Sequence, residues 1–85
     1  MERKNIRIGE ELTLDGRQIA QAVQLADSFE SALHLLQDNA RINLKSIMGM
    51  MTVQLKAGDE ITLTAEGKDE KEAVARLSEF FGKTS

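Results

Sequence analysis

The stretch that decides the fold is EITLTAEGKDEKEAVARLSEFFG, residues 60–82. Over residues 60–66, apolar side chains alternate with polar ones, at Ile61, Leu63 and Ala65. Alternation with a period of two is typical of a strand that buries one face and exposes the other. Gly67 interrupts the pattern. The segment therefore predicts a strand whose apolar face needs a covering layer.

A helix is predicted directly after this strand. Asp69 followed by Glu72 is typical of a capping box at a helix N-terminus, and Gly82 stands where a C-terminal cap is expected. Between these two ends, apolar residues recur at spacings of three and four and therefore share one helix face: Ala73, Val74, Leu77, Phe80 and Phe81. We expect one shared core that includes Phe80, Leu77, Val23, Ile61 and Leu63.

The N-terminal part repeats this combination of strand and helix. Ile6 and Ile8 alternate with polar neighbours and predict a first strand. Asp15 is a favourable N-cap for a helix that ends near residues 27–28. Four apolar residues line one face of that helix, at Ile19, Ala22, Val23 and Ala26.

Between these units the sequence predicts a hairpin and a short helix. Residues 33–36 and 41–44 alternate on either side of Asp38-Asn39, and asparagine tolerates the positive φ of tight hairpin turns. Ser46 is a favourable N-cap for a short helix over residues 47–51. A helix this short cannot bury all its large apolar residues on one stripe. We therefore expect some of these four side chains to face solvent: Ile47, Met48, Met50 and Met51.

These assignments give the element order β-α-β-β-α-β-α. Strands with one apolar face each are satisfied by an antiparallel sheet that has helices on one face and water on the other. We therefore expect an α+β fold, an open-faced β-sandwich with a four-stranded antiparallel sheet and three helices on one face. The 85 residues predict a single domain, because they leave no room for a second core.

Composition argues against several classes of function. The chain has no cysteine, and its one histidine and scattered carboxylates show no metal-ligand spacing, so we expect no metal and no cofactor. The net charge is −3 with dispersed basic residues, which argues against direct nucleic-acid binding. No apolar run is long enough for a signal peptide or a membrane span, so we expect a cytoplasmic protein. No acid–base–nucleophile set indicates an enzyme.

Residues 43–72 resemble a known family. They begin NLKSIMGMM at residues 43–51 and continue AGDEITLTAEGKDE at residues 57–70. This run closely resembles the regulatory site of HPr, the phosphocarrier of the bacterial sugar phosphotransferase system. The resemblance implies the same open-faced sandwich. It also implies that an HPr kinase/phosphorylase phosphorylates Ser46, and that partners contact Ile47, Met48 and Met51.

The chain departs from this family at the first helix. HPr proteins have there a histidine that receives phosphate from phosphoenolpyruvate through Enzyme I. The corresponding residues 13–18 are TLDGRQ, with Asp15 at the histidine position and Gln18 at a proline position. Arg17 matches the motif, which implies a phosphate or partner contact for it. A carboxylate lacks the phosphate-transfer chemistry of imidazole, so we do not expect ordinary phosphocarrier activity.

Three interpretations of Asp15 remain open. It can serve only as a helix cap, its fixed charge can imitate a phosphorylated carrier, or it can itself accept phosphate. A chain that lacks the histidine and keeps the serine resembles the Crh-type paralogues of Gram-positive bacteria.

The leading hypothesis is therefore a regulatory protein of carbon catabolite control. Phosphorylated at Ser46, it would bind a CcpA-like LacI-type repressor as corepressor. Enzyme I-like proteins are further candidate partners. The alternatives are a divergent phosphotransfer protein that uses Asp15, and an inactive adaptor that binds partners through the helix over residues 47–51.

Overall fold

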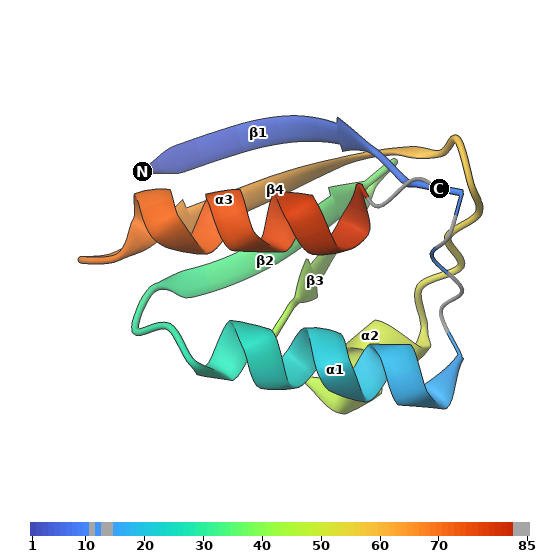
Figure 1. Ribbon diagram of the computed structural model, residues 1–85, viewed down its shortest axis with the longest axis horizontal. Coiled ribbons are helices and arrows are strands. Elements are labelled where there is room, and N and C mark those ends of the chain that lie inside the picture. The colour runs from blue at the N-terminus through green and yellow to red at the C-terminus, as the bar shows by residue number, and fades with distance from the viewer. Residues whose placement is uncertain (11, 13–14, 83–85) are drawn as a thin grey trace.

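The computed structural model describes residues 1–10, 12 and 15–82. Within these residues the elements follow the predicted order (Figure 1). Their bounds are β1 Glu2–Arg7, α1 Gly16–Asp27, β2 Ala32–Gln37, β3 Ala40–Asn43, α2 Ile47–Met51, β4 Glu60–Glu66 and α3 Glu70–Phe81. None of these helices has the length and apolarity that crossing a membrane requires.

The strands form one antiparallel sheet in the order β1-β4-β2-β3. In its interior strand β4, Ile61 lies opposite Ile6 of β1, and Leu63 lies opposite Leu35 of β2. Ile61, Leu63 and Ala65 are all buried beneath the helices. α3 packs on β1 and β4, α2 packs on β3, and α1 contacts both other helices (Figure 1). The predicted antiparallel sheet with three helices is confirmed.

The core between sheet and helices contains the predicted residues with one exception. Val23, Leu77 and the apolar residues of β4 are buried as predicted, but Phe80 is only half-buried. Phe81 is fully buried in its place, because positions 74, 77 and 81 lie on the helix face that meets the sheet. Phe80 lies at the margin, edge-on to Phe81, with ring centroids 5.2 Å apart.

The predicted capping box at the start of α3 is wrong. The Asp69 side chain makes no cap hydrogen bond to its own helix. Its carboxylate instead accepts hydrogen bonds from the backbone N–H groups of Glu30 and Ser31, at 2.9 and 3.0 Å, and from the Ser31 hydroxyl. Glu70 makes the local bond, because its Oε1 accepts from the Gly67 N–H at 3.0 Å.

The close approach of the α1–β2 loop to Gly67 explains this difference. A Cβ at position 67 would lie 2.7 Å from the Cα of Ser31, and φ at Gly67 is +152°, a region that favours glycine. Glycine therefore lets the loop come close enough for its donors to satisfy the Asp69 carboxylate. Hydrogen bonds to an ionised acceptor are stronger than neutral ones, which favours this arrangement.

β2 and β3 form the predicted hairpin, with Gln37 opposite Ala40 across the turn. Asp38, rather than the predicted Asn39, adopts the positive φ, at 54°. Aspartate shares the tolerance of asparagine for this region, because its short polar side chain can hydrogen-bond to the local backbone. The turn position was predictable, whereas the residue that takes the left-handed conformation was not.

Truncating Phe81 should destabilise the protein more than truncating Phe80. Phe81→Ala removes a fully buried ring and should lower the free energy of unfolding by about 3–5 kcal/mol. Phe80→Ala empties a half-exposed site that solvent can fill, and should cost about half as much. Urea unfolding of both variants checks this, with Leu77→Ala as a buried reference. Equal losses for the two phenylalanines would contradict the core described here.

The Asp69 hydrogen bonds should make stability depend on pH. Bonds from the Ser31 hydroxyl, and then from the Glu30 backbone, hold the pKa of Asp69 below its usual value of 3.8. A carboxyl whose pKa is lower in the folded state stabilises above its unfolded pKa, and this contribution is lost as pH falls through the folded pKa. Asp69→Asn should therefore lower the urea midpoint at neutral pH, and the gap to wild type should close below pH 3.8.

Two further variants complete this experiment. Ser31→Ala should weaken the same pH dependence, and its effect should not add to that of Asp69→Asn, because the two residues share one hydrogen bond. Asp27→Asn, an exposed carboxylate at the end of α1, is the matched control. An Asp69→Asn gap that stays constant on acidification would contradict the stabilising role.

Candidate functional site

Ser46 caps α2 as predicted. Its backbone is extended, and its Oγ accepts a hydrogen bond from the Gly49 N–H at 3.0 Å. Before it, the Asn43 side chain accepts from the Lys45 N–H at 2.9 Å, and the Asn43 carbonyl accepts from the Ser46 N–H at 3.0 Å. These bonds turn the chain from β3 into α2 and hold the serine at the helix start.

The Ser46 hydroxyl takes part in the cap as an acceptor. The residue is half-buried, and its Oγ acts as an acceptor in the cap, which leaves the hydroxyl proton uncommitted there. A Cβ at position 49 would lie 3.3 Å from this oxygen, so Gly49 leaves it uncrowded. A phosphoryl group on this oxygen would place nearly two negative charges beside the N–H groups of the first helical turn.

α2 exposes three of its apolar side chains. Ile47 is 50% exposed, Met48 is 81% exposed and Met51 is 66% exposed, whereas Met50 is completely buried. A helix of five residues makes little more than one turn, so it can direct few side chains at the core. We call Ile47, Met48 and Met51 the α2 surface. The prediction that part of this helix faces solvent is confirmed, and the exposed residues directly follow Ser46.

One contact at this site is not predicted by the sequence. The half-buried Lys45 donates a hydrogen bond from Nζ to the Phe29 carbonyl at 2.8 Å. Phe29 lies just after α1, so this bond joins the end of α1 to the start of α2, and the two helices pack together (Figure 1). No local pattern indicates it, because the two residues are 16 positions apart.

Asp15 caps α1, and Arg17 follows in the first turn. Asp15 Oδ1 accepts from the Gln18 N–H at 2.9 Å, and the Asp15 carbonyl accepts from the Ile19 N–H at 2.9 Å. Both Asp15 and Arg17 are exposed, and neither forms an ion pair within the described residues. Residues 13–14 of the motif lie outside those residues. The structure links the α1 and α2 candidates through the packing of the two helices.

The one histidine in the sequence, His34, does not take the place of the histidine that position 15 lacks. His34 lies opposite Thr64 of β4, between Leu33 and Leu35, whose side chains are buried beneath the helices. The alternation of β2 therefore directs His34 to the open face of the sheet, as predicted, although it is half-buried there. Partial burial lowers the pKa of His34, and Arg41 lowers it further.

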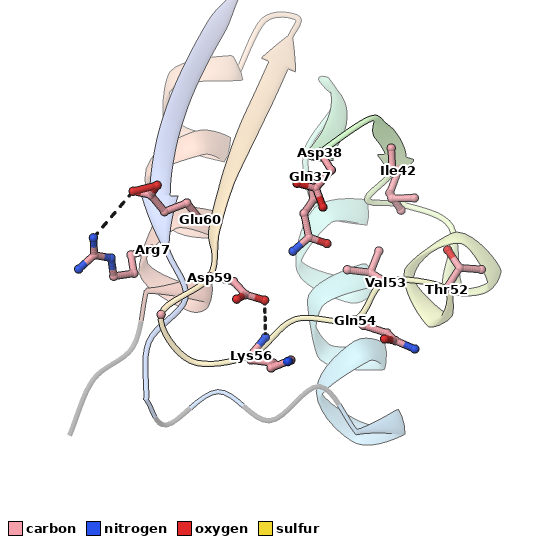
Figure 2. Close-up of a pocket in the computed structure, with 12 residues that line it drawn as sticks. Arg7, Gln37, Asp38, Ile42, Thr52, Val53, Gln54, Lys56, Asp59 and Glu60 are labelled. Carbon is pink, nitrogen blue, oxygen red and sulfur yellow. Dashed lines mark hydrogen bonds and ion pairs between the residues drawn. The ribbon is translucent and has the colours of Figure 1, made fainter.

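A groove of about 830 Å³ lies beside the β2–β3 turn, residues 52–59 and the start of β4 (Figure 2). Figure 2 shows two of its contacts, the Arg7–Glu60 ion pair at 3.8 Å and the Lys56 N–H donating to the Asp59 carboxylate at 3.0 Å. Its lining carries charges of both signs, and the described residues contain no group of three side chains suited to a metal ion. None of the predicted site residues lines it.

Comparisons with known proteins relate the chain to one family. The family model of the PTS HPr component phosphorylation site matches residues 2–83. The chain is 42% identical over 67 residues to the HPr-like protein Crh of Bacillus subtilis, covering 79% of each chain. It is 36% identical over 78 residues to the phosphocarrier protein HPr of Treponema pallidum, covering 92% of this chain and 89% of that protein. The crystal structure of HPr from Bacillus anthracis matches with a TM-score of 0.87 at 32% identity, covering 94% of this chain and 95% of that chain.

The sheet, its three helices and the serine cap before α2 define a small HPr-like α+β protein. The chain belongs to the HPr family, whose model matches nearly all of it. Its relatives include both HPr-like Crh proteins and a phosphocarrier, so membership alone does not separate regulation from phosphate transfer.

Removing the Ser46 hydroxyl should lower the stability of the protein without changing its fold. Ser46→Ala loses the cap on the Gly49 N–H and should lower the free energy of unfolding by about 1 kcal/mol. Ser46→Gly should cost only a few tenths of a kcal/mol, because glycine is tolerated at this position. Urea unfolding and an amide NMR spectrum measure both effects. A collapsed spectrum in either variant would show that Ser46 has a larger structural role than a cap.

Proposed function

We propose that this protein is a regulatory HPr-like protein that an HPr kinase/phosphorylase phosphorylates at Ser46 at the expense of ATP. The phosphorylated form acts as a corepressor or effector in carbon catabolite control, in complex with a CcpA-like LacI-type repressor. One observation carries the proposal: the Ser46 hydroxyl stands at the start of a helix whose next residues form the exposed α2 surface. A phosphate on Ser46 would therefore lie directly beside exposed apolar side chains.

Phosphorylation would change this surface in a way that a partner can read. The phosphate adds nearly two negative charges and three strong acceptor oxygens, which suit arginine side chains on a partner. Ile47, Met48 and Met51 supply apolar side chains that a partner can bury, and methionine adapts readily to different surfaces. Docking that needs both the charge and the apolar contact would be specific for the phosphorylated state.

Ordinary histidine phosphocarrier activity is not part of this proposal. The carboxylate of Asp15 stands at the phosphocarrier position and is already bound to the Gln18 N–H. An acyl phosphate on that carboxylate would differ in geometry and transfer chemistry from a phosphoimidazole. This supports a role in signalling over one in catalysis or phosphate transfer.

The relatives support the same choice. The Bacillus subtilis Crh, which shares 42% identity with this chain, is described as a catabolite repression HPr. We place the present chain with this group because it keeps the serine and lacks the histidine. The fixed charge of Asp15 adds a negative group at the start of α1 without any modification.

Titration of a CcpA-like repressor with phosphorylated and unmodified protein tests the proposal. Phosphate at Ser46 should strengthen binding at least about tenfold, since a desolvated charged contact is worth more than 1.4 kcal/mol. Met48→Ala should weaken binding of the phosphorylated form, because it removes the most exposed part of the α2 surface.

Two controls accompany the titration. Ser46→Ala should bind like unmodified protein before and after incubation with kinase and ATP. Ala75→Gln, an exposed change on α3, should leave the affinity of the phosphorylated form unchanged. Equal affinities of the phosphorylated and unmodified proteins would favour an adaptor that binds through α2 without a switch.

A further inference from the structure

The four methionines of the chain differ sharply in their access to solvent. Met48 is 81% exposed, Met1 is 74% exposed and Met51 is 66% exposed, whereas Met50 is completely buried. Two of the exposed residues therefore belong to the α2 surface. The third, Met1, lies at the N-terminal end of α3, where its ammonium group pairs with Glu70 at 2.8 Å.

Helix geometry gathers the exposed thioethers on one side of α2. Met48 and Met51 are three residues apart, a spacing that brings side chains together on a helix surface. Ile47 and Met51 are four residues apart and are neighbours in the same way. Met50 points to the opposite side and joins the core. The α2 surface thus combines two accessible sulfur atoms with one aliphatic side chain.

We propose that Met48 and Met51 form a reversible oxidation site that switches the α2 surface between an apolar and a polar state. The oxidant is a peroxide. Each thioether sulfur gives two electrons to the peroxide, the O–O bond breaks, one oxygen atom bonds to sulfur as the sulfoxide, and the other leaves as water. A methionine sulfoxide reductase reverses the step, because its thiols take up the oxygen as water and become a disulfide.

The composition leaves methionine as the main target of a peroxide. The sequence contains no cysteine, so no thiolate competes for the oxidant. Oxidation replaces a flexible apolar side chain by a polar one, which disrupts interfaces that depend on methionine. The regulatory consequence rests on the proposed function: phosphorylation of Ser46 would strengthen partner docking, and oxidation of the adjacent α2 surface would oppose it.

Site-resolved oxidation tests the site without any partner. The full-length protein is treated with hydrogen peroxide, and the sulfoxide at each methionine is followed over time by peptide mass spectrometry. Met48 and Met51 should oxidise at least about tenfold faster than Met50, because oxidation follows exposure. In urea-unfolded protein the difference should disappear. Oxidation of Met50 at the rate of Met48 in the folded protein would overturn the proposal.

Surface polarity gives the second readout that needs no partner. Oxidised protein should elute earlier from a hydrophobic-interaction column, and methionine sulfoxide reductase should restore the original retention. Met48→Leu/Met51→Leu keeps aliphatic side chains but has no oxidisable sulfur on α2, and Met1 remains as an exposed target far from it. Peroxide should shift the retention of this variant much less than that of the wild-type protein, because Met1 is its only exposed methionine among the described residues. An unchanged retention of oxidised wild-type protein would also overturn the proposal.

Repressor binding then decides the regulatory part. Oxidation should weaken the binding of Ser46-phosphorylated protein at least about tenfold, and the reductase should restore it. Met48→Leu/Met51→Leu, compared with itself before and after peroxide, should show no such change. Oxidised protein that binds as tightly as before would overturn the switch. Phosphorylated, unoxidised protein that does not bind would overturn the proposed function, and the two partner-free readouts would still judge the oxidation site.

Discussion

β4 is hydrogen-bonded to β1 on one side and to β2 on the other. The alternation of its apolar and polar side chains determines on which face of the sheet the helices lie. Ile61, Leu63 and Ala65 must all be covered on one face, so the helices collect there and the opposite face stays open. The loop that follows the strand carries Gly67 and Asp69, where the chain comes close enough to the α1–β2 loop for the Asp69 carboxylate to bind it. These hydrogen bonds join the α1–β2 loop to the start of α3, close to the end of β4.

The candidate site depends on this arrangement at one remove. The α1–β2 loop that Asp69 holds also supplies the Phe29 carbonyl, to which the Lys45 ammonium group donates. Lys45 directly precedes Ser46, so the serine cap is fixed relative to α1 and to the sheet. α2 is too short to bury more than Met50 among its large side chains, and the remaining three become a surface beside the Ser46 hydroxyl. The exposure of these three side chains thus follows from the length of the helix.

The parts of this structure that sequence predicts are those governed by local periodicity and local capping. The alternation of β4, the faces of α1 and α3, and the caps at Asp15 and Ser46 all depend on residues within a few positions of one another. The bonds of Asp69 to Ser31 and of Lys45 to Phe29 join distant segments, so no local pattern indicates them. Phe80 and Phe81 differ by one helical position, and only the final rotation of α3 against the sheet decides which of them is buried.

The central claim is that this HPr-family chain accepts phosphate at the α2 cap and not at the start of α1. Intact-mass measurement tests it most directly, with the same protein incubated either with HPr kinase/phosphorylase and ATP or with Enzyme I and phosphoenolpyruvate. The account predicts one phosphoryl group from ATP, absent in Ser46→Ala, and none from phosphoenolpyruvate. A phosphoryl group gained from phosphoenolpyruvate and lost in Asp15→Ala, with none gained from ATP, would contradict it.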